Sequence, residues 1–103
     1  MIDLTVARAE RLLNDRRRRA AILPALSADD QAWAILLWLF IRGERREQVR
    51  SDDLFTANAL SHPVGERWLA LLQQIGLLAP ATGDTVALTE SASATMREYL
   101  AEA

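Results

Sequence analysis

The sequence predicts a mostly helical protein with one small β-hairpin, and three observations support this fold class. Apolar residues recur at helical spacing over most of the 103 residues. Ser, Thr, Asp and Gly residues stand where these periodic segments begin and end, as helix caps do. One segment near the C-terminus instead has two short apolar arms around a turn of Pro, Thr, Gly and Asp, which is typical of a hairpin.

The N-terminal segment predicts a helix over residues 3–20. Its apolar residues are spaced by three or four positions and form one stripe, which comprises Ile2, Val6, Ala9 and Leu13. Consecutive arginines at 16–19 end this helix, where cations stabilise the negative end of the helix dipole. The same arginines carry the charge to bind phosphates. Consecutive helical residues point in different directions, however, so only some of them could face one DNA duplex.

A second helix is predicted over residues 27–42, with Ser27 as its N-cap and Gly43 as its stop. Its apolar run at 32–41 spans ten residues, whereas a membrane-spanning helix needs about 20. Because such a run leaves no polar face, the helix must be covered nearly all round. We expect the N-terminal helix or a second copy of the chain to cover the side that the rest of the domain leaves open.

Shorter elements are predicted after residue 47. In order, they are a strand at 48–50, a helix at 52–58, a helix at 62–75, a hairpin at 77–89 and a helix at 90–101. The expected N-caps of the three helices are Ser51, Ser61, and Thr89 or Ser91. Gly76 is expected to end the middle helix.

This order of elements is that of a winged helix-turn-helix. The expected core residues of the two central helices are Leu54, Ala57, Val64, Trp68, Leu71, Leu72 and Ile75. The far side of the second central helix is then free to enter a DNA major groove. We expect a single winged-helix domain over residues 1–103. Its parts would be an N-terminal helical extension (1–26), a winged-helix core (27–89) and a C-terminal helix (90–103).

Several stretches of the chain resemble the MarR-type transcription regulators. LALLQQIGLL followed by VALTESASATMREYL is similar to their succession of a recognition helix, a wing and a Leu-Thr pair that opens the C-terminal helix. ERWLALLQQIGLL and NDRRRRAAILPALSADDQAWAILLWLF resemble a short alphaproteobacterial branch of that group. The resemblance covers nearly the whole chain. It implies a cytoplasmic bacterial regulator that binds a specific palindromic DNA site as a homodimer, paired through its terminal helices.

The expected recognition surface is the side of the second central helix that faces away from its core. It presents His62, Glu66, Ala70 and Gln73, with Arg67 and Gln74 on one flank. Arg67 could donate forked hydrogen bonds to guanine, and Gln73 could pair with adenine. Glu66 could accept a hydrogen bond from the amino group of cytosine. The alternative is a solvated polar face with no role in recognition.

A group of arginines just before the helix-turn-helix provides candidate phosphate contacts: Arg42, Arg45, Arg46 and Arg50. Glu44 and Glu47 alternate with them and could pair with them instead. The wing departs from the MarR-type pattern, in which the wing carries Asp and paired Arg residues that reach the DNA backbone. Residues 79–85 hold no basic residue, so that contact has no counterpart in this chain.

Charge is distributed unevenly between the two halves of the chain. Residues 1–50 hold ten arginines and seven carboxylates, for a net charge of +3. Residues 51–103 hold two arginines and seven carboxylates, for a net charge of −5. Because phosphate neutralisation supplies much of the affinity of proteins for DNA, this balance supports a second hypothesis. In it, the chain is a winged-helix module for protein–protein interaction or dimerisation that does not bind DNA.

Few residues of the chain have catalytic or metal-binding chemistry. It has no cysteine, and His62 is its only histidine, whereas a metal site needs three or four ligands. Ser61 stands next to His62 in sequence, which is not how a nucleophile and its base are arranged. We therefore expect no enzyme activity, no cofactor and no metal. Charged residues within the first 13 positions leave no apolar stretch for a signal peptide, which favours the cytoplasm without membrane association.

Self-association is also expected, because exposed apolar patches beyond a few hundred Å² are rare on monomers. The terminal helices are the predicted interface, with Leu12, Met96, Tyr99 and Leu100 as candidate contacts. A two-fold dimer would bury upwards of roughly 1,000 Å². It would also present two reading helices to a palindromic site.

Overall fold

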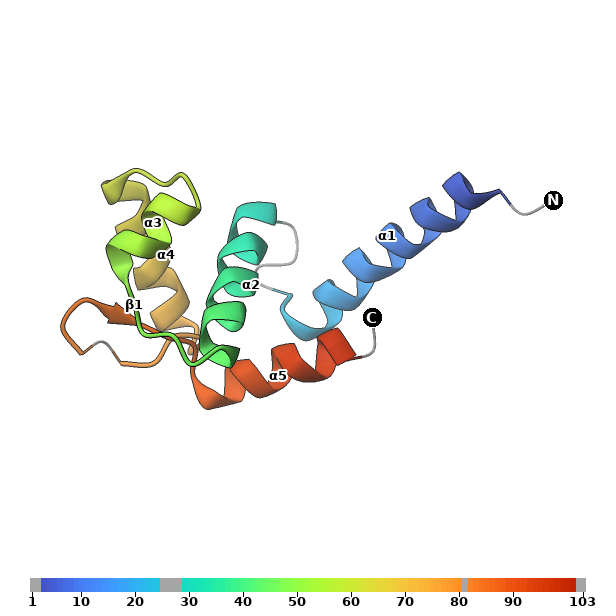
Figure 1. Cartoon of the computed structure of the whole chain (residues 1–103). Helices are drawn as coiled ribbons and strands as arrows, with labels where there is room; N and C mark the ends of the chain where they lie inside the picture. Colours follow the sequence, from blue (N-terminus) through green and yellow to red (C-terminus); the bar gives the residue numbers. More distant parts are fainter. Residues whose placement is uncertain (1–2, 25–28, 81, 102–103) are drawn as a thin grey trace.

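The computed structural model describes residues 3–24, 29–80 and 82–101, and it confirms the predicted fold class. The elements are α1 (Leu4–Ile22), α2 (Asp30–Glu44), β1 (Val49–Arg50), α3 (Ser51–Ala57), α4 (His62–Gln74), β2 (Thr85–Val86) and α5 (Glu90–Ala101). Figure 1 shows α2, α3 and α4 grouped at one end beside the small sheet, while α5 runs from there toward the base of α1. α1 points away from the rest, so the molecule is elongated, measuring 56 × 27 × 24 Å.

Two of the N-caps lie where the sequence places them. The Ser61 hydroxyl accepts a hydrogen bond from the backbone N–H of Val64 at the start of α4, and Thr89 does the same for Ala92 in α5. The predicted cap at Ser51 is wrong, because Ser51 is already helical and the cap position is Arg50. The N–H of Arg50 donates to the carboxylate of Asp53 at 3.0 Å, so a carboxylate inside α3 closes its first turn.

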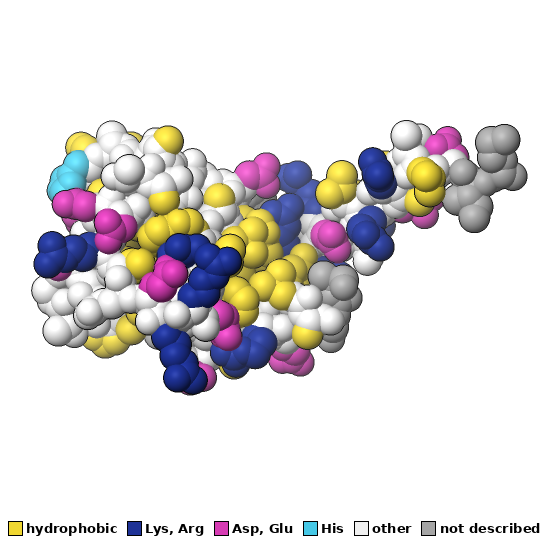
Figure 2. Space-filling model, viewed as in Figure 1, with side chains coloured by type: hydrophobic (Ala, Val, Ile, Leu, Met, Phe, Trp, Pro, Cys, Tyr) yellow, Lys and Arg dark blue, Asp and Glu magenta, His cyan; other side chains and the backbone are white. Residues whose placement is uncertain are grey.

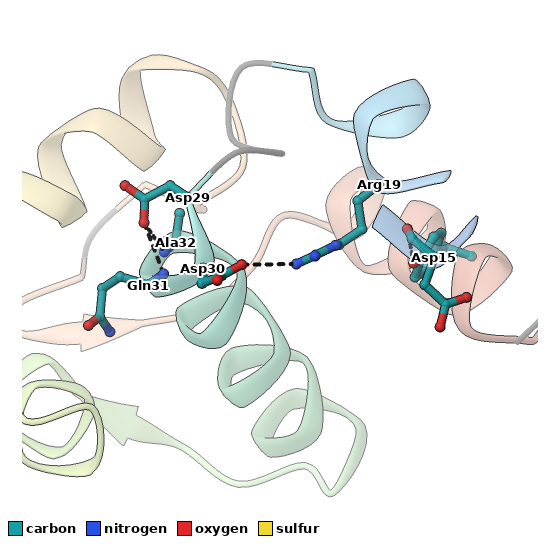
Figure 3. A network of polar contacts seen from close by, with 7 residues as sticks. Asp15, Arg19, Asp29, Asp30, Gln31 and Ala32 are labelled. Atoms are coloured by element: carbon teal, nitrogen blue, oxygen red, sulfur yellow. Dashed lines mark hydrogen bonds and ion pairs between the residues drawn. The ribbon is translucent and has the colours of Figure 1, made fainter. Parts of the chain in front are cut away.

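The start of α2 is capped by Asp29, and the predicted cap Ser27 lies outside the described residues. The Asp29 carboxylate accepts hydrogen bonds from the backbone N–H groups of Gln31 and Ala32, at 2.9 and 3.1 Å (Figure 3). These contacts satisfy two amides that have no partner within the helix. An acidic cap also complements the positive end of the helix dipole.

The predicted stop of α2 at Gly43 is wrong, because Gly43 lies inside the helix. The chain turns three residues later at Arg46, which has a φ of +57°. The N–H groups of Arg46 and Glu47 bond back to the carbonyls of Gly43 and Arg42, at 3.0 Å each. This is a Schellman motif in which an arginine holds the left-handed position that glycine usually takes. α4 ends in the same motif, with Gly76 at the left-handed position as predicted.

The predicted hairpin is present, and β2 within it pairs with β1. The two strands are antiparallel, with Val49 opposite Val86 and Arg50 opposite Thr85. The hairpin arms meet at a bridge between Leu78 and Leu88. This pairing fixes the wing beside the start of α3, and therefore beside the helix-turn-helix.

The core lies between α2, α3, α4 and α5. Its buried residues are Ala32, Ile35, Leu36, Leu39, Val49, Leu54, Phe55, Leu72, Leu78 and Met96. Within the apolar run at 32–41, the chain itself covers α2 so well that only Ala34 and Ile41 are exposed. The side of α2 predicted to need the N-terminal helix or a second copy is therefore covered mostly by the described chain. Ala57, predicted to face the core from α3, is exposed, and Phe55 takes that role.

α1 differs from the other helices because none of its residues is buried. Val6 and Leu13 of the predicted stripe are each 49% exposed, so this stripe does not cover α2 as expected. Ile2 lies outside the described residues. Leu4 and Leu12 are exposed still further, at 67% and 69%. α1 thus exposes several apolar side chains that nothing in the described chain covers.

The arginine run at the end of α1 fastens this helix to α5. The guanidinium of Arg18 donates to the carbonyl of Tyr99 at 2.7 Å and lies 4.3 Å from the centre of the Tyr99 ring. The Tyr99 hydroxyl donates in turn to the carbonyl of Asp15 at 3.0 Å. Two of these contacts use backbone carbonyls, so they hold the end of α1 and the end of α5 in a fixed relation.

Arg19 makes a second connection, from α1 to α2. It lies 3.7 Å from the carboxylate of Asp30 (Figure 3) and 5.3 Å from the ring centre of Trp33. Trp33 packs edge-on against Tyr99, with ring centres 5.4 Å apart, so the two connections share one aromatic pair. Arg18 and Arg19 therefore serve the junction of three helices rather than a phosphate surface.

Among the described helices, none is long and apolar enough to cross a membrane.

Candidate nucleic-acid interface

α4 packs on α3 through a glycine. Gly65 is buried, and a Cβ atom added there would lie 2.3 Å from the ring of Phe55, far inside van der Waals contact. Leu72, two turns further along the same face, is fully buried. The buried face of α4 is therefore centred on Gly65 and Leu72, and Phe55 determines how closely the two helices approach.

The predicted core face of α4 is only partly correct. Leu72 is buried and Trp68 is half-buried, but Val64, Leu71 and Ile75 are 37–39% exposed. The helix is turned by about 70° relative to the orientation that its apolar residues predict. The reason is packing, because the flat ring of Phe55 fits against a position without a side chain better than against a branched one.

This orientation defines an outward face of α4, which comprises Pro63, Arg67, Ala70 and Gln74. At about 100° per residue, Gln74 points directly away from Gly65, and the other three lie within about 40° of that direction. All of them are exposed. Ala70 and Arg67 belong to the predicted recognition surface, and Gln74 moves from its flank to the centre. The sequence prediction did not include Pro63.

Glu66 and Gln73 lie on the flank of α4 that faces the wing. Together with Ala70 they line a groove of about 280 Å³ between α4 and the turn that contains Asp84 and Thr85. Glu66 and Asp84 give this groove two carboxylates. Both carboxylates have a partner within the chain, which is His62 for Glu66 and Arg50 for Asp84.

His62 turns away from the outward face at the first position of α4. Its Nε2 atom lies 3.4 Å from Oε1 of Glu66, one helical turn later. Its ring packs edge-on against Phe55, with ring centres 5.5 Å apart. His62 and Glu66 therefore contact each other on the surface, so the carboxylate of Glu66 already has one partner.

Arg67 is the basic side chain on the outward face. Its Nε atom lies 3.5 Å from the carbonyl of Pro63, a contact at the limit of hydrogen-bond length. Within the described part of the chain, no carboxylate lies within ion-pair distance of its guanidinium. Most of its donors are thus available to a partner outside the chain.

The predicted phosphate contacts divide into two pairs. Arg42 lies 2.9 Å from the carboxylate of Glu47 and 5.8 Å from the ring centre of Trp38, and Arg50 lies 3.5 Å from the carboxylate of Asp84. Arg45 and Arg46 are exposed, and the ion pairs of residues 3–24, 29–80 and 82–101 do not include them. Arg45 and Arg46 are therefore the better placed pair for phosphates.

Acidic and basic side chains are mixed over this part of the surface. Figure 2 shows arginines and carboxylates alternating across the visible face, without one continuous basic patch. Glu44 contributes to this mixture by binding Arg97 of α5, and the hydrogen bond between them raises the pKa of Arg97. The carboxylate of Glu44 is thus engaged by Arg97. No group of His, Cys, Asp or Glu that could hold a metal ion is found among the residues described.

One sequence signal could have located the outward face. A glycine inside a helix costs about 1 kcal/mol relative to alanine, so it usually marks a close approach of backbone to another element. Gly65 is such a residue, and centring the buried face on it places Arg67 and Gln74 outward. The apolar pattern alone could not do so, because α4 has more apolar residues than its core face holds.

Comparisons with known proteins agree with this architecture. No protein-family model matches the sequence, and neither does any curated protein. Among solved structures, the chain is similar to MepR, a transcription regulator of the Staphylococcus aureus multidrug efflux pump MepA. The TM-score is 0.61 at 14% identity, over 93% of this chain and 74% of MepR.

The chain is also similar to NadR, solved in complex with 4-hydroxyphenylacetate. The TM-score is 0.63 at 19% identity, over 97% of this chain and 74% of NadR. Both neighbours are MarR-family winged-helix proteins. At these identities the likeness concerns the fold, and it agrees with the element order and the wing described above. The chain therefore has the winged helix-turn-helix fold of the MarR-type regulators.

Proposed function

We propose that the chain is a sequence-specific DNA-binding transcriptional regulator that acts as a homodimer on a palindromic site. The observation that carries this proposal is the outward face of α4, where Arg67 has no carboxylate partner among the described residues. A helix held in this way by a helix-turn-helix enters the major groove of DNA. The likeness to MepR, a transcription regulator, supports the same function. Such a regulator would act in the cytoplasm, beside the chromosome.

Phosphate contacts in this proposal come from Arg45 and Arg46. Arg46 is notable because it has a positive φ, which costs a non-glycine residue about 1–2 kcal/mol. Arg46 has no ion-pair partner among the described residues, and a residue kept at such a position is a candidate for a role outside the fold. Arg42 and Arg50, in contrast, would first have to leave Glu47 and Asp84.

Arg46→Gly separates the two roles of this residue. Because glycine adopts a positive φ freely, we expect the variant to be more stable by up to about 1 kcal/mol. We also expect it to bind every DNA sequence more weakly and to show a smaller dependence of affinity on salt. Chemical denaturation and fluorescence anisotropy at several salt concentrations measure the two effects. Unchanged affinity and salt dependence would remove Arg46 from the interface.

The dimer in this proposal forms through α1. Its exposed apolar residues, such as Leu4 and Leu12, need a cover that the described chain does not provide. Met96 and Tyr99 of the predicted interface are buried within the chain, so their side chains are not available to a second copy. Leu12→Glu should therefore yield a monomer in light scattering behind a sizing column, and Ala94→Glu on the exposed surface of α5 is its control.

Selection of bound sequences from a random DNA pool tests DNA recognition itself. On a selected site, Arg67→Ala should cost about 1–3 kcal/mol of binding free energy, as expected for a side chain that reads a base. Arg45→Ala should weaken binding to selected and scrambled DNA alike. A pool that yields no enriched sequence, together with no loss for either variant, would contradict the proposal.

A second candidate function is protein–protein interaction through α4. One specific observation favours it, because Val64 and Leu71 are exposed side by side and line a shallow apolar pocket with Trp68 and Arg67. The groove beside the wing is lined by Glu66 and Asp84 and by no basic side chain of the described residues, so it also does not favour phosphates. If the random pool yields no enriched sequence, this candidate takes precedence. Val64→Ser would then weaken partner binding while leaving the buried face of α4 intact.

A further inference from the structure

Two of the four residues of the outward face of α4 are apolar. Pro63 and Ala70 are both exposed there, one turn before and one turn after Arg67. Pro63 has no N–H group and Ala70 ends in a methyl group, so neither side chain can donate or accept a hydrogen bond. The outward face therefore offers a base edge two apolar contacts around one guanidinium.

The polar side chains of α4 are mostly turned elsewhere. Glu66 contacts His62, 3.4 Å away, and Gln73 lines the groove that faces the wing. Arg67 and Gln74 remain as the hydrogen-bonding groups directed outward. This leaves few donors and acceptors to distinguish the base pairs that α4 would cover.

The major-groove edges of DNA carry one apolar group, the 5-methyl of thymine, and alanine is among the side chains that contact it. Arg67 and Ala70 are three residues apart, a rise of about 4.5 Å along the helix. Successive bases on one strand are separated by about 3.4 Å. The long side chain of Arg67 and the short side chain of Ala70 lie on the same side of the helix. They therefore reach neighbouring base pairs.

Building on the DNA binding proposed above, we infer that α4 recognises thymine through its 5-methyl group at Ala70, beside a guanine bound by Arg67. Affinity for the selected site then depends on a methyl group rather than on a hydrogen bond at the thymine. Uracil differs from thymine only in lacking that methyl and keeps every Watson–Crick contact. Replacing one by the other isolates the proposed contact.

The experiment uses the full chain and the site obtained from the random pool, with each thymine replaced singly by deoxyuridine. We expect about a fourfold loss of affinity at one thymine per half-site, the factor that corresponds to burial of roughly one methylene group. That thymine should adjoin the guanine whose replacement loses its effect in Arg67→Ala. All other deoxyuridine replacements should leave the affinity within error.

Ala70→Ser tests the same contact by changing the protein instead of the DNA. Serine adds a hydroxyl group to the Cβ of alanine and so replaces the apolar methyl contact by a polar group. The fourfold penalty for deoxyuridine should therefore disappear in this variant. Ala94→Ser, on the exposed surface of α5, controls for the effect of serine on helix stability and should retain the full penalty.

The outcomes separate this inference from the proposed function. If the chain binds a selected site and Arg67→Ala weakens it, but no deoxyuridine replacement has an effect, the methyl contact is refuted and DNA recognition stands. A penalty that persists in Ala70→Ser assigns the methyl contact to another residue and also overturns the inference. If no sequence is enriched from the pool, the proposed function and the inference fail together.

Discussion

α1 and α2 are the two longest helices of the chain, yet they are held in opposite ways. α2 buries Ala32, Ile35, Leu36 and Leu39 and forms the centre of the core. α1 has none, and among the described residues Asp15, Arg18 and Arg19 in its last two turns bind the rest of the chain. Both helices have apolar residues at helical spacing. Their comparison shows that spacing predicts a helix, whereas burial depends on which neighbours the fold provides.

The largest difference between these helices should appear when one leucine of each is shortened. Leu36 in α2 is 1% exposed and Leu12 in α1 is 69% exposed. Leu36→Ala removes buried atoms and leaves a cavity, so we expect a loss of about 2–5 kcal/mol in the free energy of unfolding. Leu12→Ala should change it by less than about 0.5 kcal/mol at low protein concentration. Chemical denaturation monitored by circular dichroism measures both.

The dependence of stability on protein concentration distinguishes these two variants further. If α1 mediates a dimer, the stability of the native chain rises with concentration, and Leu12→Ala reduces that rise. The cost of Leu36→Ala should not depend on concentration in this way. Equal losses for both variants at the lowest concentration would show that α1 is covered within a single chain, and the contrast between α1 and α2 would be lost.

A smaller effect is expected from two glycines that lie inside helices. A methyl group on Gly65 of α4 meets the ring of Phe55, whereas nothing lies within 4 Å of the same position on Gly43 of α2. We expect Gly65→Ala to destabilise the chain by about 1–3 kcal/mol through overpacking. Gly43→Ala should stabilise it by up to about 1 kcal/mol through helix propensity.

Thermal unfolding of these glycine variants tests whether the contact between Gly65 and Phe55 is tight or can adjust. A Gly65→Ala variant as stable as the native chain would mean that α3 and α4 can move apart at little cost. The orientation of α4 would then not be fixed by Phe55, and the assignment of its outward face would lose its basis.

The helix order and several caps could be predicted from the sequence because those signals are local. Ser61 and Thr89 each satisfy an amide three residues away, and Gly76 needs only its own positive φ. The rotation of α4 could not be predicted from its apolar residues, since these cover more of the helix than the core can bury. It depends on Phe55, ten residues earlier, and Gly65 was the sequence signal for that contact.

The role of the arginine run could not be predicted, because its partners are distant in sequence. Arg18 binds the carbonyl of Tyr99, 81 residues away, and no local sequence pattern predicts such a contact. Within the candidate site, Arg67 and Ala70 could be predicted from the helix-turn-helix pattern alone. Which of the nearby arginines are already paired depended on the positions of Glu47 and Asp84 in space.

A still smaller effect is expected at the junction that joins the two regions. The Tyr99 hydroxyl donates to the carbonyl of Asp15, and Tyr99→Phe removes this bond while keeping the ring against Trp33. We expect a loss of about 0.5–1.5 kcal/mol, the net contribution of one hydrogen bond. Hydrogen exchange should localise the loss to the end of α1 and leave α2 protected. Exchange that increases throughout the core would instead make Tyr99 part of the central packing.

The smallest effect is expected from pH at the free end of α1. Asp3 caps this helix: its carboxylate accepts hydrogen bonds from the side chain of Thr5 and from the backbone N–H groups of Thr5 and Val6. These bonds lower the pKa of Asp3, with the side chain of Thr5 contributing most. A carboxylate with a lowered pKa in the folded state stabilises that state above its unfolded pKa, near 3.9, and loses this effect as the pH falls through the lower folded value.

We therefore expect the first turn of α1 to loosen below about pH 4, while α2 remains intact until the whole chain unfolds. Cα chemical shifts of residues 4–7, followed by NMR from neutral pH downward, report this local change. Asp3→Asn is the matched control, because asparagine also caps helices but does not titrate in this range. Its α1 shifts should stay constant where those of the native chain move. Since the cap is fully exposed, the change should be confined to the first turn, and a simultaneous shift of α2 resonances would show that α1 and the core unfold as one unit.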